Sequence, residues 1–341
     1  MYSNLRPLLF RIDPERVHAF TLQLIGLAGN MAVSRWLLRR IFPVKSRPVR
    51  AFGLDFPNPV GLAAGYDKDA IAWRGLASLG FGHVEIGTVT LRPQPGNEKP
   101  RVFRLVEDQA VINRMGFPGK GSDFVLKRII SRGLANVVLG VNIGKNKNTP
   151  LDQAASEYAE LLIRFSPYAD YIAINISSPN TVGLRHLQAR NELENLLDMI
   201  STTRNKIIHS NAEKSPPILV KLAPDLSDLE LEDALNAITA SGMDGVIATN
   251  TTLDRPSLES NYSKEIGGLS GLPLFSKSLQ MVKKIGQLTK NRLPVIGVGG
   301  IMSSEQAQLM LDNGAVLVQV YTGLIYSGPG FVSQVIRELR V

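Results

Sequence analysis

The sequence of 341 residues contains no cysteine. This absence excludes disulfides, thiolate-held zinc or iron–sulfur clusters and a cysteine nucleophile or base. Histidine is scarce as well, and its four copies are His18, His83, His186 and His209. Their positions show no spacing typical of a metal ligand set, so we expect no metal site. The lack of thiols is compatible with a reducing, cytosol-facing location.

The body of the chain carries almost no net charge. The sequence has 38 Lys and Arg against 30 Asp and Glu, a formal net charge of +8. Residues 1–50 contain nine basic and two acidic residues, so they hold seven of these eight charges. A nucleic-acid-binding protein should be basic over a folded face. We therefore expect no nucleic-acid partner and assign the basic character to an N-terminal segment.

Apolar residues in this N-terminal segment recur at helical spacing. They are Val17, Phe20, Leu24, Leu27 and Met31, followed by Val33, Trp36, Leu37 and Ile41. Steps of three and four predict two short amphipathic helices, separated near Gly29 and Asn30. Asp13 and Pro14 are the expected start of the first helix, as an N-cap residue and a proline at the first helical position.

Two placements are considered for this segment: contact with a membrane, and packing on the body of the protein. Residues 17–34 carry no charge, but their His, Thr, Gln, Asn and Ser residues make a poor membrane span. Acidic residues precede the apolar stretch and no small-residue cleavage site follows it, which disfavours a signal peptide. An arginine-rich amphipathic pair favours a position in the membrane interface, and a helical cap on the body is the alternative. We place the domain boundary between residues 1–45 and 46–341.

From about residue 58, short apolar or β-branched runs alternate with helical patterns. Such alternation requires parallel strands joined by crossover helices, and eight units indicate an α/β fold, a (β/α)8 TIM barrel with a small helical extension. The competing doubly wound sheet predicts one glycine-rich turn after the first strand. Here polar residues or glycines follow nearly every run, as expected where all strand ends meet at one rim. The expected strands cover residues 58–65, 83–89, 137–144, 171–177, 217–223, 245–251, 294–300 and 316–323.

Glycines end the last two expected strands. Gly299 and Gly300 end the seventh expected strand, and Tyr321, Thr322 and Gly323 end the eighth. In a barrel these are the positions where backbone N–H groups bind phosphate, and glycine allows an anion to approach closely. The sequence therefore predicts a phosphate site here, and a purely structural turn is the alternative.

Two lysines are candidates for the same rim. Lys221 lies within an otherwise apolar strand, and desolvating its ammonium costs several kcal/mol unless a partner is present. We therefore expect it to face a bound anionic or electron-rich group. Lys68 follows Gly65 just after the first strand, where a solvated loop lysine is the alternative.

Amide side chains gather after several strands. Asn175 and Asn180 flank Ser178 after the fourth strand, and Asn113 and Asn250 belong to the same rim. Such a cluster supplies both hydrogen-bond donors and acceptors, which suits a planar heterocycle with imide edges and a carboxylate. A Ser-Pro-Asn turn without function is the alternative. No catalytic histidine or pair of carboxylates accompanies the cluster, which disfavours a hydrolase with a triad or two carboxylates.

Nine sequence blocks together resemble, in order, the motifs of dihydroorotate dehydrogenases. They are AAGYDKD (63–69), NRMGF (113–117), NIGKN (142–146), INISSPNT (174–181), VKLAPD (220–225), IATNTT (247–252), GGLSG (267–271), IGVGGI (296–301) and YTG (321–323). With its amphipathic N-terminal segment, the chain is similar to the membrane-associated, quinone-reducing class 2 of that family. The clearest departure is Tyr66, where we expect Leu or Phe.

The resemblance implies that FMN-dependent oxidation converts dihydroorotate to orotate in pyrimidine (UMP) biosynthesis, and that a membrane quinone, ubiquinone or menaquinone, accepts the electrons. Ser178 is the implied catalytic base, at the position where soluble classes have cysteine. The implied FMN contacts are Ala64, Gly65, Lys68, Thr88, Asn142, Asn175, Lys221, Thr249, Gly271, Gly300, Tyr321 and Thr322. The implied substrate contacts are Lys68, Asn113, Arg114, Met115, Gly116, Phe117, Asn175, Asn180, Asn250 and Thr251. The implied quinone tunnel contains His18, Arg104 and Tyr321, so residues 1–45 would also give the quinone access.

The resemblance further implies a division of labour at the reacting atoms. Ser178 would take a proton from substrate C5 while a hydride leaves C6 for flavin N5, and Lys221 would stabilise negative charge at the N1–C2=O2 edge. We expect a peripheral membrane protein on the cytoplasmic face of the bacterial cell membrane, and a monomer. Two alternatives are another FMN-dependent barrel oxidoreductase acting on a related pyrimidine, and a non-catalytic barrel tethered to a membrane.

Overall fold

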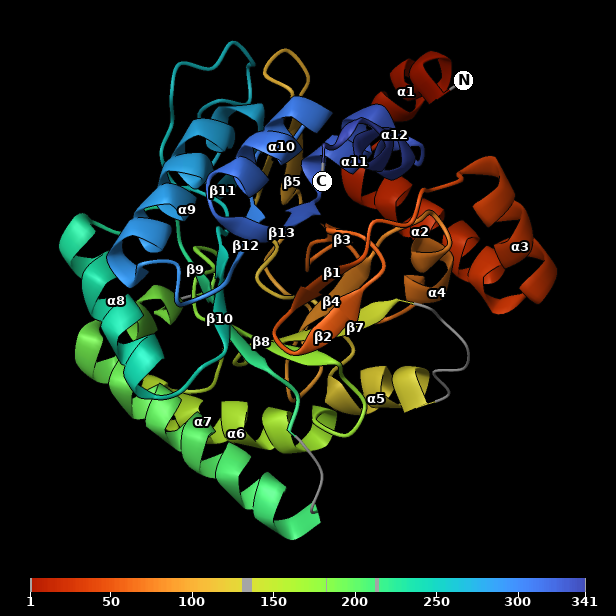
Figure 1. Cartoon of the computed structure of the whole chain (residues 1–341). Helices are drawn as coiled ribbons and strands as arrows, with labels where there is room; N and C mark the ends of the chain where they lie inside the picture. Colours follow the sequence, from red (N-terminus) through yellow and green to blue (C-terminus); the bar gives the residue numbers. More distant parts are fainter. Residues whose placement is uncertain (1, 131–136, 182, 212–214, 341) are drawn as a thin grey trace.

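A closed barrel of eight parallel strands forms the centre of the molecule (Figure 1). The computed structural model describes residues 2–130, 137–181, 183–211 and 215–340. Around the barrel the strands follow in chain order, and the last pairs with the first to close the ring. They are β3 (Val60–Leu62), β4 (His83–Val89), β7 (Val138–Ile143), β8 (Tyr171–Asn175), β9 (Ile218–Leu222), β10 (Gly245–Ala248), β12 (Val295–Val298) and β13 (Ala315–Val320). Each overlaps one of the eight expected runs, so the TIM-barrel prediction is confirmed.

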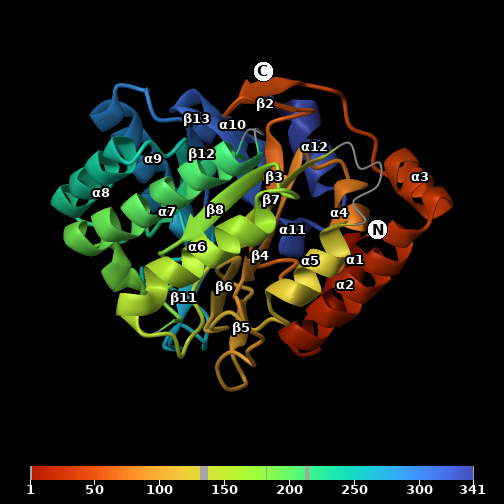
Figure 2. The same ribbon diagram turned by 90° about the horizontal axis from the view of Figure 1, so that it is seen from below.

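Helices connect the strands and cover the outside of the barrel (Figure 2). The largest apolar core lies between these helices and the outward-facing strand side chains. Local sequence fixes the start of α8, where Ser227 and Glu230 form a reciprocal capping box. The helices of the body are α4 (Trp73–Ala77), α5 (Ser122–Ile130), α6 (Ala154–Phe165), α7 (Arg190–Asn211), α8 (Asp228–Ala240), α9 (Phe275–Thr289), α10 (Ser304–Asp312), α11 (Thr322–Ser327) and α12 (Phe331–Glu338).

A short antiparallel hairpin closes the amino-terminal end of the barrel. It consists of β1 (Val49–Ala51) and β2 (Leu54–Phe56), and the buried Phe56 ring meets the His83 ring edge-to-face at 5.4 Å. Neither ring nitrogen of His83 has a hydrogen-bond partner within the described part of the chain, and burial lowers the pKa of His83 to about 3. His83 is therefore a neutral core residue at neutral pH, and this end of the barrel is a packed plug.

A three-stranded antiparallel sheet stands at the opposite, carboxyl-terminal end of the barrel. Its strands are β5 (Val102–Leu105), β6 (Ala110–Asn113) and β11 (Gly268–Gly271), in the order β11-β6-β5. An isolated bridge between Thr252 and Leu269 joins it to the segment after β10. The sequence analysis did not anticipate this sheet, which places Asn113 beside the rim of the barrel.

Three helices, α1 (Tyr2–Phe10), α2 (Pro14–Asn30) and α3 (Ala32–Ile41), form the N-terminal helical segment (Figure 1). Two of them were expected, and the Asp13 carboxylate caps α2 by accepting the N–H of Arg16 at 2.9 Å. The sequence analysis missed α1, which contains an internal proline. Close packing holds α2 on α4, because a Cβ at Gly29 would lie 2.5 Å from the backbone nitrogen of Gly75.

The outer face of the N-terminal helical segment remains apolar and exposed. Trp36 at the surface of α3 lies under the Arg40 guanidinium, 5.3 Å from the ring centroid. Among the described residues no single helix has the length and composition of a membrane span. Only α2 and α3 taken together have them, and the break between these two helices bends the pair by 112°. The exposed apolar side chains include Phe20, Leu24, Leu27, Met31, Val33, Trp36, Leu37 and Ile41. The segment thus packs on the body with one face and presents the other to the surroundings.

Candidate active site

Alternation along the strands decides which side chains reach the inside of the barrel. In β9, Ile218, Val220 and Leu222 belong to the outer core, whereas Leu219 belongs to the inner one. A period of two therefore turns Lys221 inward, one layer closer to the carboxyl-terminal rim. The same period brings the inward side chains of β4, β7, β8 and β13 together at this level.

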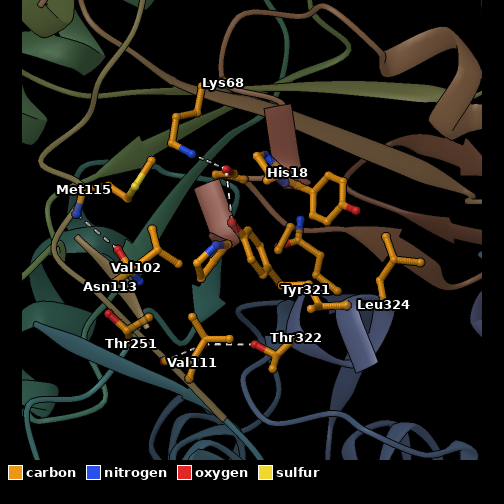
Figure 3. A pocket seen from close by; sticks show the side chains of 18 of the residues that line it. His18, Lys68, Val102, Val111, Asn113, Met115, Thr251, Tyr321, Thr322 and Leu324 are labelled. Atoms are coloured by element: carbon orange, nitrogen blue, oxygen red, sulfur yellow. Dashed lines mark hydrogen bonds between the residues drawn. The ribbon is translucent and has the colours of Figure 1, made fainter. Parts of the chain in front are cut away.

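A single cavity of about 550 Å³ joins the rim of the barrel to the N-terminal helical segment. Most of the predicted site residues line it, including those predicted for three different ligands (Figure 3). From the FMN set these are Ala64, Gly65, Lys68, Thr88, Asn175, Lys221, Thr249, Gly300, Tyr321 and Thr322. The cavity is further lined by Asn113, Met115, Gly116, Phe117, Ser178, Asn180, Asn250 and Thr251, and by His18 and Arg104.

Three predicted contact residues lie behind the wall of the cavity. Asn142 is fully buried and accepts hydrogen bonds from Thr88 Oγ1 at 2.6 Å and Asn175 Nδ2 at 3.2 Å. Arg114 is turned away, because its guanidinium binds the Glu265 carboxylate at 2.6 Å. Gly271 ends β11. Thr88 and Asn175, the partners of Asn142, line the cavity. Direct contact with a ligand stays a prediction for all three residues.

The glycine pair after β12 forms a backbone cradle. Gly299 and Gly300 have φ values of +120° and +76°, which an L side chain rarely adopts. A Cβ at Gly300 would lie 2.4 Å from the backbone nitrogen of Phe275, and one at Gly299 would lie 2.2 Å from Ser278 Oγ. A side chain at either position would clash with these atoms, so both positions require glycine. Thr322, after the neighbouring strand β13, lines the cavity. Both close approaches are to the protein itself, so the phosphate site stays a prediction beside the structural turn.

Lys221 is the cation in the floor of the cavity. Its side chain is 6% exposed, and its Nζ lies 3.6 Å from the Oε1 of Glu85, which is completely buried. Because the ammonium lies at a cavity rather than in solvent, it can also face an electron-rich ligand. Glu85 is a partner that the sequence did not point to, and contact of Lys221 with a bound anionic or electron-rich group stays a prediction.

Asparagine side chains form a linked cluster around Ser178. Asn250 Nδ2 donates to Ser177 Oγ at 3.0 Å and to Asn175 Oδ1 at 3.3 Å. Asn180 Nδ2 donates to Asn113 Oδ1 at 3.3 Å. The Ser178 hydroxyl is buried at the cavity and accepts the Asn180 N–H at 3.3 Å. This hydroxyl keeps a lone pair and a proton available to a ligand, and the amides around it offer donors and acceptors.

Lys68 and Tyr321 approach the same oxygen, the carbonyl of Gly65 (Figure 3). Lys68 Nζ donates to it at 2.5 Å and the Tyr321 hydroxyl at 3.3 Å. Burial lowers the pKa of Lys68 to about 8, and the attraction of the Glu15 carboxylate opposes part of this shift. At neutral pH Lys68 therefore carries a positive charge beside the cavity, which suits a carboxylate ligand.

Aromatic rings line the passage between the barrel and α2. The Tyr66 ring meets His18 edge-to-face at 4.8 Å and Tyr321 at 5.4 Å. Burial lowers the pKa of His18 to about 4, so the imidazole is neutral at neutral pH. Arg104 donates to the carbonyl oxygens of Leu9 and Phe10 at 3.2 and 3.1 Å, which fixes the end of α1. No group of three or more potential metal ligands occurs in the ranges that the structure describes.

The family model for dihydroorotate dehydrogenase matches residues 48–341. This chain belongs to the dihydroorotate dehydrogenase family. Among its relatives, a dihydroorotate dehydrogenase (quinone) from Idiomarina loihiensis is 48% identical over 99% of this chain and 100% of its own length. One of the same name from Stutzerimonas stutzeri is 46% identical, covering 99% and 98%. A crystal structure of DHODH from Eimeria tenella in complex with ferulenol has a TM-score of 0.85 at 38% identity, covering 96% of this chain and 90% of that one.

These matches confirm the resemblance, the barrel fold and the assignment to the oxidoreductases of this family. The relatives are matched through the N-terminal helical segment as well as the barrel. The individual roles of the site residues in this dihydroorotate dehydrogenase family member stay predictions, and so does the boundary after residue 45. The cavity bears on that boundary, because its wall combines residues from both sides.

Sequence analysis missed two buried charged residues of this family member. Glu85 stands within the apolar run of β4, the same signal that singled out Lys221 in β9. Arg101 precedes β5 and its side chain is only 7% exposed. It binds Glu15 of α2 with Nη2 at 2.7 Å and Nε at 3.2 Å, and its Nη1 donates to the Asn97 carbonyl at 2.7 Å. The Asn97 side chain donates in turn to the Asn180 carbonyl at 3.0 Å, so this arginine links α2 to the loop that carries Ser178.

We predict that Glu15→Gln loosens α2 from the body. The substitution leaves the buried Arg101 guanidinium without its carboxylate, so the free energy of unfolding should fall by about 1–3 kcal/mol. Chemical denaturation measures this loss, and hydrogen exchange should quicken in α2.

The matched control is Glu194→Gln, which breaks the exposed Arg190–Glu194 pair within α7. Exposed pairs contribute little, so its effect should stay below about 0.5 kcal/mol. Equal losses in both variants would contradict the role of the Glu15–Arg101 pair.

Proposed function

We propose that this chain oxidises dihydroorotate to orotate in pyrimidine biosynthesis, with FMN as cofactor and a membrane quinone, ubiquinone or menaquinone, as electron acceptor. One observation carries the proposal: the Ser178 amide cluster, the Lys221 floor and the N-terminal helical segment share one cavity. This continuity would let dihydroorotate and the membrane quinone reach one cofactor from different sides.

The donor set of the barrel rim fits FMN. The glycine cradle at Gly299 and Gly300 would hold the phosphate, with the Thr322 hydroxyl beside it. Lys221 would face the N1–C2=O2 edge of the ring system, where negative charge develops, and Asn175 would bind the ring from the neighbouring strand. When bound, FMN supplies the acceptor for the hydride that leaves substrate C6.

The amide cluster would hold the substrate opposite the floor. Asn113, Asn180 and Asn250 can pair with the imide edges, and the cationic Lys68 can bind the carboxylate. Ser178 would take the proton from substrate C5. A neutral serine is a weak base, so the amides and Lys68 must stabilise the enolate-like charge while Ser178 passes its proton to water.

Quinone would enter between the helices of the N-terminal segment. Apolar side chains of α2 and α3, among them Leu24, Ile25 and Leu38, line the cavity on this side, and the neutral His18 adds no charge to it. Exposed apolar side chains around this entrance, flanked by Arg39 and Arg40, suit a position in the membrane interface. We propose a monomeric peripheral protein on the cytoplasmic face of a bacterial membrane.

Anaerobic mixing tests the proposed function. The purified protein should be yellow, and dihydroorotate alone should bleach the flavin absorbance. A soluble quinone added next should restore it. A colourless protein would favour a non-catalytic tethered barrel, and a flavin that dihydroorotate fails to reduce would favour a related pyrimidine as substrate.

We predict that Ser178→Ala slows flavin reduction by dihydroorotate ~10²-fold or more, the scale expected for loss of a general base. Stopped-flow absorbance measures this step. Ser177→Ala is the neighbouring control and should slow it less, because the Ser177 hydroxyl is already bonded to Asn175 and Asn250. Unchanged reduction in Ser178→Ala would exclude Ser178 as the base.

A further inference from the structure

Glu85 is a completely buried carboxylate that the mechanism above does not use. It points into the barrel one layer below the cavity floor, and it is held from four different strands. Its Oε1 accepts from Asn142 Nδ2 at 2.8 Å and lies 3.6 Å from Lys221 Nζ. Its Oε2 accepts from the Tyr171 hydroxyl at 2.9 Å and Gln319 Nε2 at 2.8 Å.

These contacts hold the Glu85 carboxylate in one orientation. Leaving a charge in a barrel interior is costly unless it is paired and hydrogen-bonded, and both oxygens of Glu85 have partners. Two of the four partners, Lys221 and Gln319, line the cavity, and of all four only Lys221 carries a charge. Asn142, Tyr171 and Gln319 lie beneath or beside the pair and orient the carboxylate toward the lysine.

We propose that Glu85 is a positioning residue that sets the reduction potential of the bound flavin through Lys221. The proposal rests on the proposed function, in which Lys221 faces the flavin edge that gains negative charge on reduction. Glu85 holds the ammonium at the cavity floor and cancels part of its positive charge. Glu85 itself forms no bond to the cofactor and transfers no proton.

The sign of the effect follows from electrostatics. A positive charge near the flavin edge stabilises the reduced cofactor more than the oxidised one, and a carboxylate 3.6 Å from that charge reduces the difference. The Glu85 side chain is completely buried and that of Lys221 is only 6% exposed, so the two charges are weakly screened. Removing the carboxylate charge should therefore favour the reduced cofactor.

The decisive measurement is the two-electron midpoint potential of FMN in the Glu85→Gln holoenzyme. Glutamine keeps the shape of the side chain and removes its charge. We expect the reduced cofactor to be favoured about tenfold more over the oxidised one than in the parent, which raises the potential by ~30 mV. An unchanged or lower potential overturns the proposal, whereas failure of the flavin to bleach with dihydroorotate in the parent would count against the proposed function instead.

Two further variants separate charge from packing. Tyr171→Phe removes a neutral donor from the same carboxylate but leaves the charge, so it should not raise the potential. A rise equal to that of Glu85→Gln would assign the effect to packing and overturn the proposal. Glu85→Asp keeps the charge but withdraws it from Lys221 by one methylene, so we expect a smaller rise. This variant carries the test if Glu85→Gln does not fold, and an unmoved potential in it then overturns the proposal.

Discussion

Closure of the barrel is the constraint on which the rest of the structure depends. In a closed ring every second side chain of every strand points inward, and below the rim the interior is filled by apolar residues, the Glu85 network and the Phe56–His83 plug. Inward-pointing polar side chains at the carboxyl-terminal ends of the strands therefore face the same space, the cavity at the rim. Lys221 of β9, Asn175 of β8 and Thr249, directly after β10, meet at one cavity for this reason.

The N-terminal helical segment completes this cavity rather than standing apart from it. Gly29 allows α2 to touch α4, and the Glu15–Arg101 pair joins α2 to the loops above the barrel. The chain of contacts from Arg101 through Asn97 ends on the Asn180 backbone. The helices that would admit quinone are thus mechanically connected to the loop that would hold the substrate.

Much of this architecture could be predicted because it rests on local periodicity and on motifs. Eight apolar runs with polar ends were enough for the barrel, and nine ordered motifs were enough for the family. The sheet of β5, β6 and β11 escaped prediction because each strand has only four residues. In addition, β11 pairs with β6 across more than 150 positions of sequence, as Gly268 does with Asn113. Motif transfer also could not tell Asn142 and Arg114, which lie behind the cavity wall, from residues that line it. Glu85 carries the same signal as Lys221, a charged residue within an apolar strand, although its role is internal to the barrel.

A variant with a blocked quinone entrance tests the central claim, which is that dihydroorotate and quinone reach one cavity from opposite sides. Ala28 of α2 lines the cavity, whereas the adjacent Leu27 is 66% exposed and lies outside it. Stopped-flow absorbance of Ala28→Trp, with Leu27→Trp as control, separates flavin reduction by dihydroorotate from flavin reoxidation by quinone. The account predicts normal reduction and slowed reoxidation in Ala28→Trp alone. Unimpaired reoxidation, or equal slowing of both steps, would contradict it.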